Sequence, residues 1–72
     1  MKVINIAQDY GRRIKDLRQA MGLTQEAFAY EVGTTVATIN KWENYRNKPS
    51  KMAIKLMGLI AKEKGLEFNL NV

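Results

Sequence analysis

Apolar residues along the chain recur at spacings of three and four, which is the period expected of amphipathic α-helices. Short polar or glycine-containing segments divide the chain into four such stretches, which predict helices over residues 6–21, 25–32, 36–44 and 51–64. The stripe of the first helix consists of Ile6, Tyr10, Ile14, Leu17 and Met21, and that of the last consists of Ala53, Leu56, Met57, Ile60 and Ala61. The pattern predicts an all-α domain over residues 1–65.

Residues with known capping preferences flank the predicted helices. Serine and threonine side chains accept hydrogen bonds from free backbone N–H groups at a helix start, and glycine adopts the left-handed conformation that ends many helices. The predicted N-caps are Thr24, Thr35 and Ser50, and the predicted terminating glycines are Gly22 and Gly65. Asn5 and Gln8, three residues apart, are typical of a capping box and predict that the first helix starts near Ile6.

The stretch over residues 24–43, TQEAFAYEVGTTVATINKWE, predicts two short helices joined by a tight turn. Two helices connected by three or four residues cross at a steep angle, and a large side chain at the crossing would push their axes apart. Ala29 is small enough for that position, and Gly33 supplies the positive φ that the turn needs. Ile39 and Trp42 then face the first helix of the pair as core residues. The stretch therefore predicts a helix-turn-helix.

This stretch and its flanks resemble the helix-turn-helix domain of phage-repressor and Cro proteins, the XRE family. The resemblance extends over residues 11–60, and the segment 42–60, WENYRNKPSKMAIKLMGLI, is similar to stand-alone and antitoxin-type members. The matching residues are Arg18, Gly22, Leu23, Thr24, Gln25, Ala29, Gly33, Thr35, Ile39, Trp42, Glu43, Pro49 and Ser50. The resemblance implies a phage-repressor-like domain of four to five helices. It also implies an ion pair between Arg18 and Glu43 that orients the second helix of the motif.

The resemblance further implies which residues contact DNA bases. Recognition helices of this type use their N-terminal residues on base edges. The matching positions are Val36, Ala37, Asn40 and Lys41. Val36 and Ala37 offer only apolar contact, for example to a thymine methyl group, which predicts weak discrimination there. Asn40 is suited to adenine, and Lys41 is suited either to guanine O6 and N7 or to a phosphate.

A second group of residues is expected to contact DNA phosphates. These residues are Gln25, Thr35, Thr38, Asn44, Arg46 and Lys48. Gln25 is the first residue of its helix, where free N–H groups favour anions, although a good first-turn residue without such a contact is the competing interpretation. Arg46 and Lys48 lie in the loop that contacts phosphate in the family. Residues 34–55 contain five basic residues and one acidic residue, Glu43, which favours a polyanion partner.

Charge and composition narrow the functional classes. The 72 residues include 12 Lys and Arg against 7 Asp and Glu, a formal net charge of +5. A basic small domain suits nucleic acid, although many small soluble domains are basic without binding it. Cysteine and histidine are absent, which excludes disulfides, thiolate metal sites and the commonest general base. We therefore expect neither an enzyme nor a bound cofactor or metal.

Membrane and export signals are also missing from the pattern. No apolar run approaches the roughly 20 residues of a membrane-spanning helix, so we expect no membrane partner. The amino-terminal sequence MKVINIAQDY carries an acidic residue, Asp9, and has no long apolar core, which argues against a signal peptide. These features predict a cytoplasmic protein.

Residues 66–72 follow a different period. Leu66, Phe68, Leu70 and Val72 alternate with polar residues, which predicts a half-buried β-strand at the carboxyl terminus. A strand needs a partner for its backbone groups. Residues 2–5 could pair with it within the same domain, or the same segment of a second copy could pair with it as a dimer contact. A disordered tail is the third interpretation.

These observations lead to two functional hypotheses. The first is a homodimeric, sequence-specific regulator of transcription, a repressor, whose helix over residues 36–44 enters the major groove of double-stranded DNA. The second is an antitoxin or adaptor, in which the apolar start of that helix and the alternating carboxyl-terminal segment contact a protein partner such as a toxin. The two functions are compatible in one protein, since a toxin-neutralising protein can also bind DNA.

Overall fold

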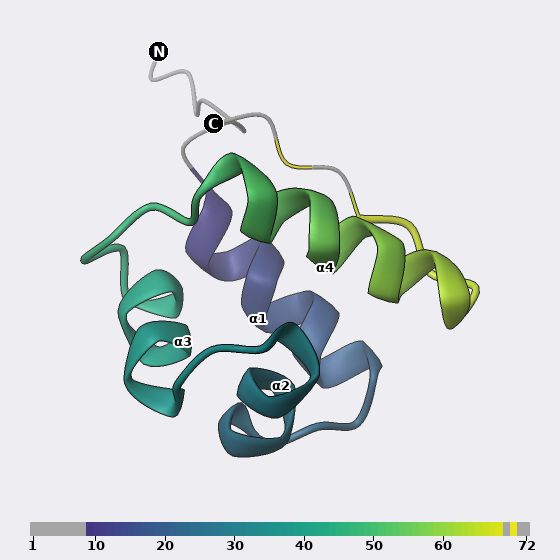
Figure 1. The fold of residues 1–72 in the computed structure, drawn as a ribbon, viewed down its shortest axis with the longest axis horizontal. Coiled ribbons are helices and arrows are strands. Elements are labelled where there is room, and N and C mark those ends of the chain that lie inside the picture. The colour runs from purple at the N-terminus through teal and green to yellow at the C-terminus, as the bar shows by residue number, and fades with distance from the viewer. Residues whose placement is uncertain (1–8, 69, 71–72) are drawn as a thin grey trace, which may run out of the picture.

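The computed structural model describes residues 9–68 and residue 70, and within them the chain forms four α-helices. They are α1 (Tyr10–Ala20), α2 (Gln25–Val32), α3 (Val36–Glu43) and α4 (Lys51–Glu63), arranged as Figure 1 shows. The helices confirm the all-α prediction. Among the described residues, no helix has the length and apolar character needed to cross a membrane.

Helix α1 starts later than the sequence predicts. Its N-cap is Asp9, whose φ of −93° and ψ of 39° are not helical, so the helix begins at Tyr10. The predicted start near Ile6 is therefore wrong. The Asp9 carboxylate makes no capping bond within the helix, because it accepts a hydrogen bond from the Tyr45 hydroxyl group instead. The capping box predicted over residues 5–8 lies outside the described residues.

The other three helices start at their predicted caps. Each cap oxygen accepts a hydrogen bond from the backbone N–H of the third residue of its helix, at 3.1, 3.2 and 3.1 Å for Thr24, Thr35 and Ser50. Each bond satisfies a donor that has no partner within the helix. Because α2 and α3 both begin as predicted, residues 33–35 form the short turn between them.

All four helices end in the same hydrogen-bonding motif. The backbone N–H groups of Leu23, Thr34, Arg46 and Leu66 each bond the carbonyl oxygen five residues earlier, at 2.9–3.1 Å. This motif needs a left-handed residue just before the donor, and glycine adopts that conformation most easily. Gly22, Gly33 and Gly65 supply it with φ values of 70°, 83° and 71°. At the end of α3 the position is held by Tyr45, with a φ of 60°.

The buried core lies where the four helices meet. Each helix contributes one large side chain that is fully buried: Ile14, Phe28, Ile39 and Met57. Other buried apolar residues include Tyr10, Leu17, Ala29, Val32, Trp42, Ala61 and Leu70. The apolar stripe of α1 and the core positions of the helix-turn-helix are therefore confirmed for the residues that the structure describes.

The buried face of α4 is rotated relative to the predicted stripe. Met57 is fully buried and Ala53 and Ile60 are half-buried, but Leu56 is 37% exposed. Successive residues turn by about 100° around an α-helix, so a face centred on Met57 directs Leu56 toward solvent. Ile54, on the opposite flank of Met57, packs against the core instead. The prediction of Leu56 as a core residue is wrong.

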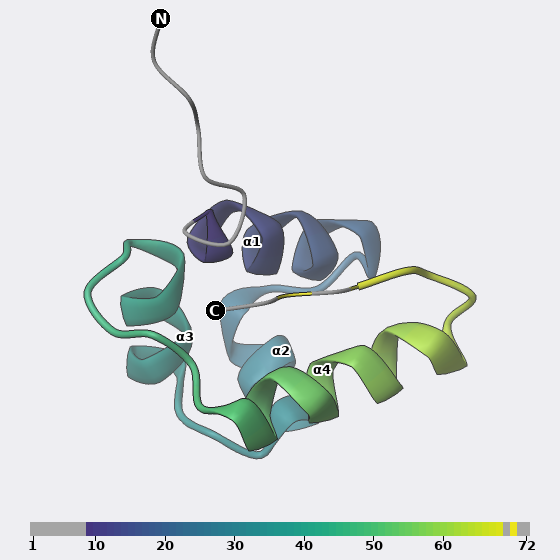
Figure 2. The same cartoon turned by 90° about the horizontal axis from the view of Figure 1, so that it is seen from above.

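Residues 66–68 and 70, the tail, do not form the predicted β-strand. None of these residues lies in a strand, yet Leu66 and Phe68 are half-buried and Leu70 is buried in the core. Figure 2 shows the tail running back between α1 and α4. Alternation indicates only that one side of an extended segment is covered, and here helices provide the cover. The predicted pairing with residues 2–5 lies outside the described residues.

Candidate nucleic-acid interface

Helix α3 turns one face to the core and the other to solvent. Ile39 is fully buried and Trp42 is 6% exposed, which fixes the inner face of the helix. The four predicted base-edge residues all lie on the outer side and are exposed: Val36, Ala37, Asn40 and Lys41. We call these four residues the α3 face. The helix lies at one edge of the molecule in both views (Figures 1 and 2), so the α3 face is accessible to a large partner.

The predicted phosphate-contacting residues surround the α3 face. Thr35 and Thr38 lie at the start of the helix, with their hydroxyl oxygens 3.0 Å apart. Asn44, Arg46 and Lys48 follow its end and are all exposed. Gln25 is half-buried at the start of α2. The fold thus brings polar or cationic side chains to both ends of one exposed helix.

An ion pair holds α3 against α1. The Arg18 Nε atom donates to Glu43 Oε2 at 2.7 Å, and Nη2 donates to Glu43 Oε1 at 3.1 Å. A third bond runs from Arg18 Nη1 to the Leu23 carbonyl oxygen at 3.0 Å. The two side chains are only 13% and 4% exposed, and the hydrogen bond to Glu43 raises the pKa of Arg18. This confirms the ion pair that the resemblance implied, and its two-pronged geometry fixes the angle between the helices.

The ion pair also determines the charge around the α3 face. Glu43 is the acidic residue of the stretch over residues 34–55, and its carboxylate is neutralised by Arg18 beneath the surface. The five basic residues of the same stretch are all exposed: Lys41, Arg46, Lys48, Lys51 and Lys55. The stretch therefore presents positive charge to solvent, which attracts a polyanion.

A polar network connects the α3 face to the ion pair. Gln25 Nε2 donates to Glu43 Oε1 at 3.1 Å, and Asn40 Nδ2 donates to Gln25 Oε1 at 3.5 Å. The sequence analysis assigned Gln25 and Asn40 to separate DNA contacts and missed this connection. Asn40 and Glu43 are three residues apart on one helix face, which is the sequence signal that they share a neighbour.

Tyr45 is a second feature that the sequence analysis missed. Its hydroxyl oxygen accepts from the Arg12 backbone N–H at 3.1 Å, and its hydroxyl group donates to Asp9 Oδ1 at 2.6 Å. The donation to Asp9 is the main cause of a raised pKa for the Tyr45 phenol. Its ring lies edge-on to that of Tyr10, with centroids 5.2 Å apart. The only signal in the sequence was a bulky residue where helix ends favour glycine.

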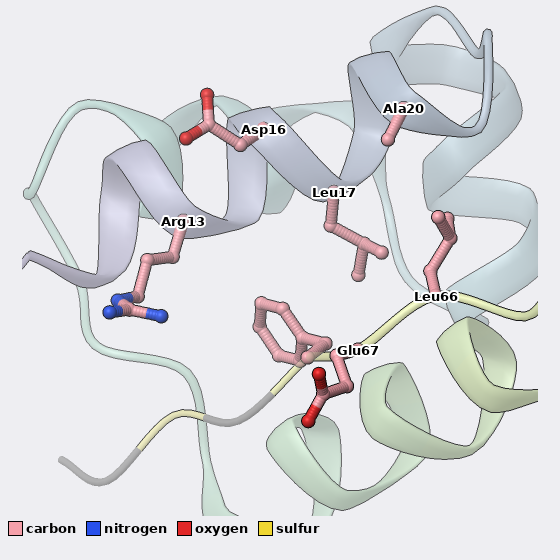
Figure 3. Close-up of a pocket in the computed structure, with 7 residues that line it drawn as sticks. Arg13, Asp16, Leu17, Ala20, Leu66 and Glu67 are labelled. Carbon is pink, nitrogen blue, oxygen red and sulfur yellow. The ribbon is translucent and has the colours of Figure 1, made fainter.

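A surface groove of about 230 Å³ lies elsewhere, between α1 and the tail. Its lining residues are Arg13, Asp16, Leu17, Ala20, Leu66, Glu67 and Phe68. Figure 3 shows Leu17 and Arg13 pointing from α1 toward the tail, while Asp16 points away. Because the lining includes none of the predicted DNA-contacting residues, the groove and the α3 face are separate features of the surface.

Comparison with known proteins identifies relatives in sequence. A helix-turn-helix family model matches residues 14–58. Similar curated proteins include the uncharacterized HTH-type transcriptional regulator YiaG of Escherichia coli strain K12 and its counterpart in strain O157:H7. Each is 45% identical over 47 residues, which cover 65% of this chain and 49% of the relative. The chain therefore spans about half the length of these curated relatives.

The fold has a counterpart among solved structures. The nuclear magnetic resonance structure of the DNA-binding domain of the P22 C2 repressor matches with a TM-score of 0.69 and 25% sequence identity. The match covers 78% of this chain and 72% of that domain, and it confirms the predicted phage-repressor-like fold. The family is not one of enzymes, as expected. Because the family model covers more than half of the chain, the chain belongs to the helix-turn-helix family of the XRE type, which includes the Cro and C1 repressors.

Proposed function

We propose that this protein is a sequence-specific, double-stranded DNA-binding regulator of transcription, acting as a repressor, that inserts α3 into the major groove. The observation that carries the proposal is the exposed α3 face on a helix whose angle is fixed by the Arg18–Glu43 pair. An α-helix fits the major groove of B-form DNA, and exposed cations at its ends suit the flanking phosphates. The names of the YiaG relatives and of the P22 C2 domain support the same function.

The α3 face offers two kinds of base contact. Val36 is 42% exposed at the first helical position, and with Ala37 it provides an apolar surface for a thymine methyl group. Asn40 gives one amide proton to Gln25 and keeps the other, together with its carbonyl oxygen, for adenine N7 and N6. Lys41 is suited to guanine O6 and N7, or to a phosphate. We expect most of the base discrimination to come from Asn40 and Lys41.

Phosphate contacts would fix the register of the duplex. Gln25 gives one of its two amide protons to Glu43, so one remains for a phosphate oxygen. Asn44 likewise donates one amide proton to the backbone carbonyl oxygen of Asn40, at 2.8 Å, and its second amide proton remains for a phosphate. The Thr35 and Thr38 hydroxyl groups share one hydrogen bond, which leaves one proton between them for DNA. Arg46 and Lys48 add full charges, and such contacts position a protein without reading sequence.

A homodimer is part of the proposal. A two-fold dimer presents two recognition helices about 34 Å apart, which matches half-sites separated by one turn of DNA. The operator would then be an inverted repeat, because the symmetry of the site mirrors that of the protein.

Selection from a randomised duplex pool, followed at low and at physiological salt, tests this function. We expect enrichment of an inverted repeat with half-sites about one helical turn apart, and affinity that falls steeply as salt rises. Salt-sensitive binding without enrichment would reveal a backbone binder that lacks base discrimination. An absence of binding at low salt would rule out the proposed function.

Two alanine variants separate the roles within the interface. Lys41→Ala should cost about 1–3 kcal/mol on the selected duplex and relax specificity at one position. Arg46→Ala should weaken binding to all duplexes alike. It should also reduce by about 1 the slope of the logarithm of the binding constant against the logarithm of the salt concentration. Lys62→Ala removes the same charge at the end of α4 that is far from α3 in Figure 1, and should leave binding unchanged. The proposal fails if neither Lys41→Ala nor Arg46→Ala changes the affinity.

Exposed apolar side chains favour a second candidate function, an antitoxin or adaptor that binds a protein partner. Tyr30 on α2 is 84% exposed, and Met52 and Leu59 on α4 are 80% and 53% exposed. Co-expression with a neighbouring toxic reading frame tests this candidate. Rescue of growth that survives Lys41→Ala but is lost in Leu59→Glu would establish a protein partner bound away from the α3 face.

A further inference from the structure

The start of α1 and the end of α3 meet at an unusually close joint. A Cβ atom at Gly11 would lie only 2.8 Å from the carbonyl oxygens of Trp42 and Glu43. Real side chains do not tolerate such distances, so glycine allows the backbone of α1 to pack directly on the last turn of α3. The joint therefore places the first turn of α1 beside the residues that follow α3.

Tyr45 closes this joint at a conformational cost. Its φ of 60° lies in the left-handed region, where a Cβ atom is disfavoured. The side chain offsets that cost with contacts to the other helix: its ring lies edge-on to Tyr10, and its hydroxyl group bonds both Arg12 N–H and Asp9 Oδ1. The Arg12 N–H belongs to the first turn of α1, where backbone donors have no partner within the helix. The Tyr45 hydroxyl group thus caps the first turn of α1, a role that the side chain of the N-cap residue Asp9 does not fill.

The same residue determines how the chain leaves α3. Directly after Tyr45, the Arg46 backbone N–H bonds the Lys41 carbonyl oxygen at 2.9 Å. This bond forms only while Tyr45 keeps its left-handed conformation, since that conformation turns the chain back over the helix end. Arg46 and Lys48 therefore start from a point that is fixed relative to the α3 face as long as the Tyr45 hydroxyl group holds α1.

We propose that Tyr45 is a positioning residue for DNA binding, which anchors the loop over residues 46–48 to the first turn of α1 so that Arg46 meets a phosphate in register with the α3 face. This inference rests on the proposed function. It assigns the effect to the hydroxyl group and its two partners, Asp9 and Arg12, and not to the bulk of the aromatic ring.

A double-mutant cycle between Tyr45→Phe and Arg46→Ala, on the duplex selected by the wild-type protein, tests the inference. Tyr45→Phe keeps the ring and removes the anchor, and we expect it to weaken binding roughly fivefold in the wild-type background. In the Arg46→Ala background the same change should have less than about a twofold effect, because the side chain it positions is gone. Equal losses in the two backgrounds, or no loss in either, would overturn the inference. Tyr30→Phe removes an exposed tyrosine hydroxyl from α2 and is the matched control.

Two further variants separate positioning from a loss of folding. Asp9→Asn keeps a carbonyl oxygen that accepts from Tyr45 and should preserve binding, whereas Asp9→Ala should resemble Tyr45→Phe. Amide hydrogen exchange of Arg12 should accelerate in Tyr45→Phe while exchange in α2 stays unchanged. Full DNA affinity in Asp9→Ala, or unchanged exchange at Arg12 in Tyr45→Phe, would overturn the inference without touching the proposed function. A wild-type protein that binds no duplex would overturn both.

Discussion

Helices α3 and α4 are both packed on the core by apolar side chains, but α3 is also held by polar contacts to α1. The end of α3 is tied to α1 by the Arg18–Glu43 pair, at 2.7 and 3.1 Å, and by the Tyr45 hydroxyl group. Helix α4 is held through apolar burial, centred on the fully buried Met57 and extended by Leu70 of the tail. Hydrogen bonds are directional, whereas apolar burial depends mainly on the area removed from water.

This difference indicates that the polar contacts of α3 set the angle of that helix, whereas the apolar contacts of α4 mainly stabilise the folded state. A helix that presents side chains to a partner must keep its angle, and directional contacts provide that. A helix that completes the core through apolar burial is constrained mainly in the area it removes from water, and only weakly in its angle. We therefore expect substitutions at α3 contacts to affect DNA binding beyond their effect on folding, and substitutions at the buried positions of α4 to affect folding alone.

The largest effect is expected from Glu43→Ala. It leaves the Arg18 guanidinium buried without its partner, which should reduce the free energy of unfolding by about 3–5 kcal/mol. Urea unfolding monitored by Trp42 fluorescence measures this loss. Glu63→Ala, at the exposed end of α4, is the matched control and should stay within about 0.5 kcal/mol of the wild type. A loss below about 1 kcal/mol for Glu43→Ala would place the pair among ordinary surface ion pairs.

Replacing both partners sharpens the same comparison. Apolar residues of similar size often restore the stability that a broken buried pair loses, so Arg18→Met combined with Glu43→Leu should recover most of the unfolding free energy. DNA affinity should remain low in the double variant, because apolar contact does not fix the angle of α3. Recovery of both properties together would show that the ion pair contributes only stability.

A smaller loss is expected from Met57→Ala on α4. Truncation of this fully buried side chain removes apolar contacts and leaves a cavity, at a cost of about 2–4 kcal/mol in urea unfolding. Leu59→Ala, on the exposed side of the helix, should change stability by less than about 0.5 kcal/mol. At a temperature where Met57→Ala is fully folded, its DNA affinity should lie within about twofold of the wild type. A larger change in DNA affinity would show that packing of α4 also determines the orientation of α3.

Local patterns were sufficient to predict most of the fold. The hydroxyl caps and glycine stops act within a few residues, so their outcome could be predicted from the sequence at Thr24, Thr35, Ser50, Gly22 and Gly65. The exposure of Leu56 could not be predicted, because apolar residues cover much of α4 and leave open which side of the helix is buried. The tail was misassigned because period-two burial arises wherever one side of an extended chain is covered, by a sheet or by helices.

The exposed side of α3 could be predicted from residues of that helix alone, whereas contacts between residues far apart in the sequence could not be predicted from local patterns. The α3 face follows from the buried Ile39 and Trp42 on the same helix. The Arg18–Glu43 pair, 25 residues apart, required the family resemblance. The bond between Tyr45 and Asp9 spans 36 residues, and no local pattern predicts that a strained tyrosine will find its partner there.

The smallest effect, and the sharpest check on the α1–α3 joint, is the pH dependence of Tyr45. Donation to Asp9 raises the pKa of the Tyr45 phenol above its ordinary value of 10.0, so the folded state binds this proton more tightly than the unfolded chain. The resulting stabilisation is complete below about pH 10 and is lost as pH rises through the folded-state pKa. The useful quantity is the difference in unfolding free energy between the wild type and Tyr45→Phe, because contributions common to both proteins cancel in it. That difference should be constant from about pH 7 to 9 and should shrink by about pH 11, as urea titrations at each pH would measure. A difference near zero at every pH would mean that the hydroxyl group does not hold the joint, and that the edge-on ring contact with Tyr10 does so instead.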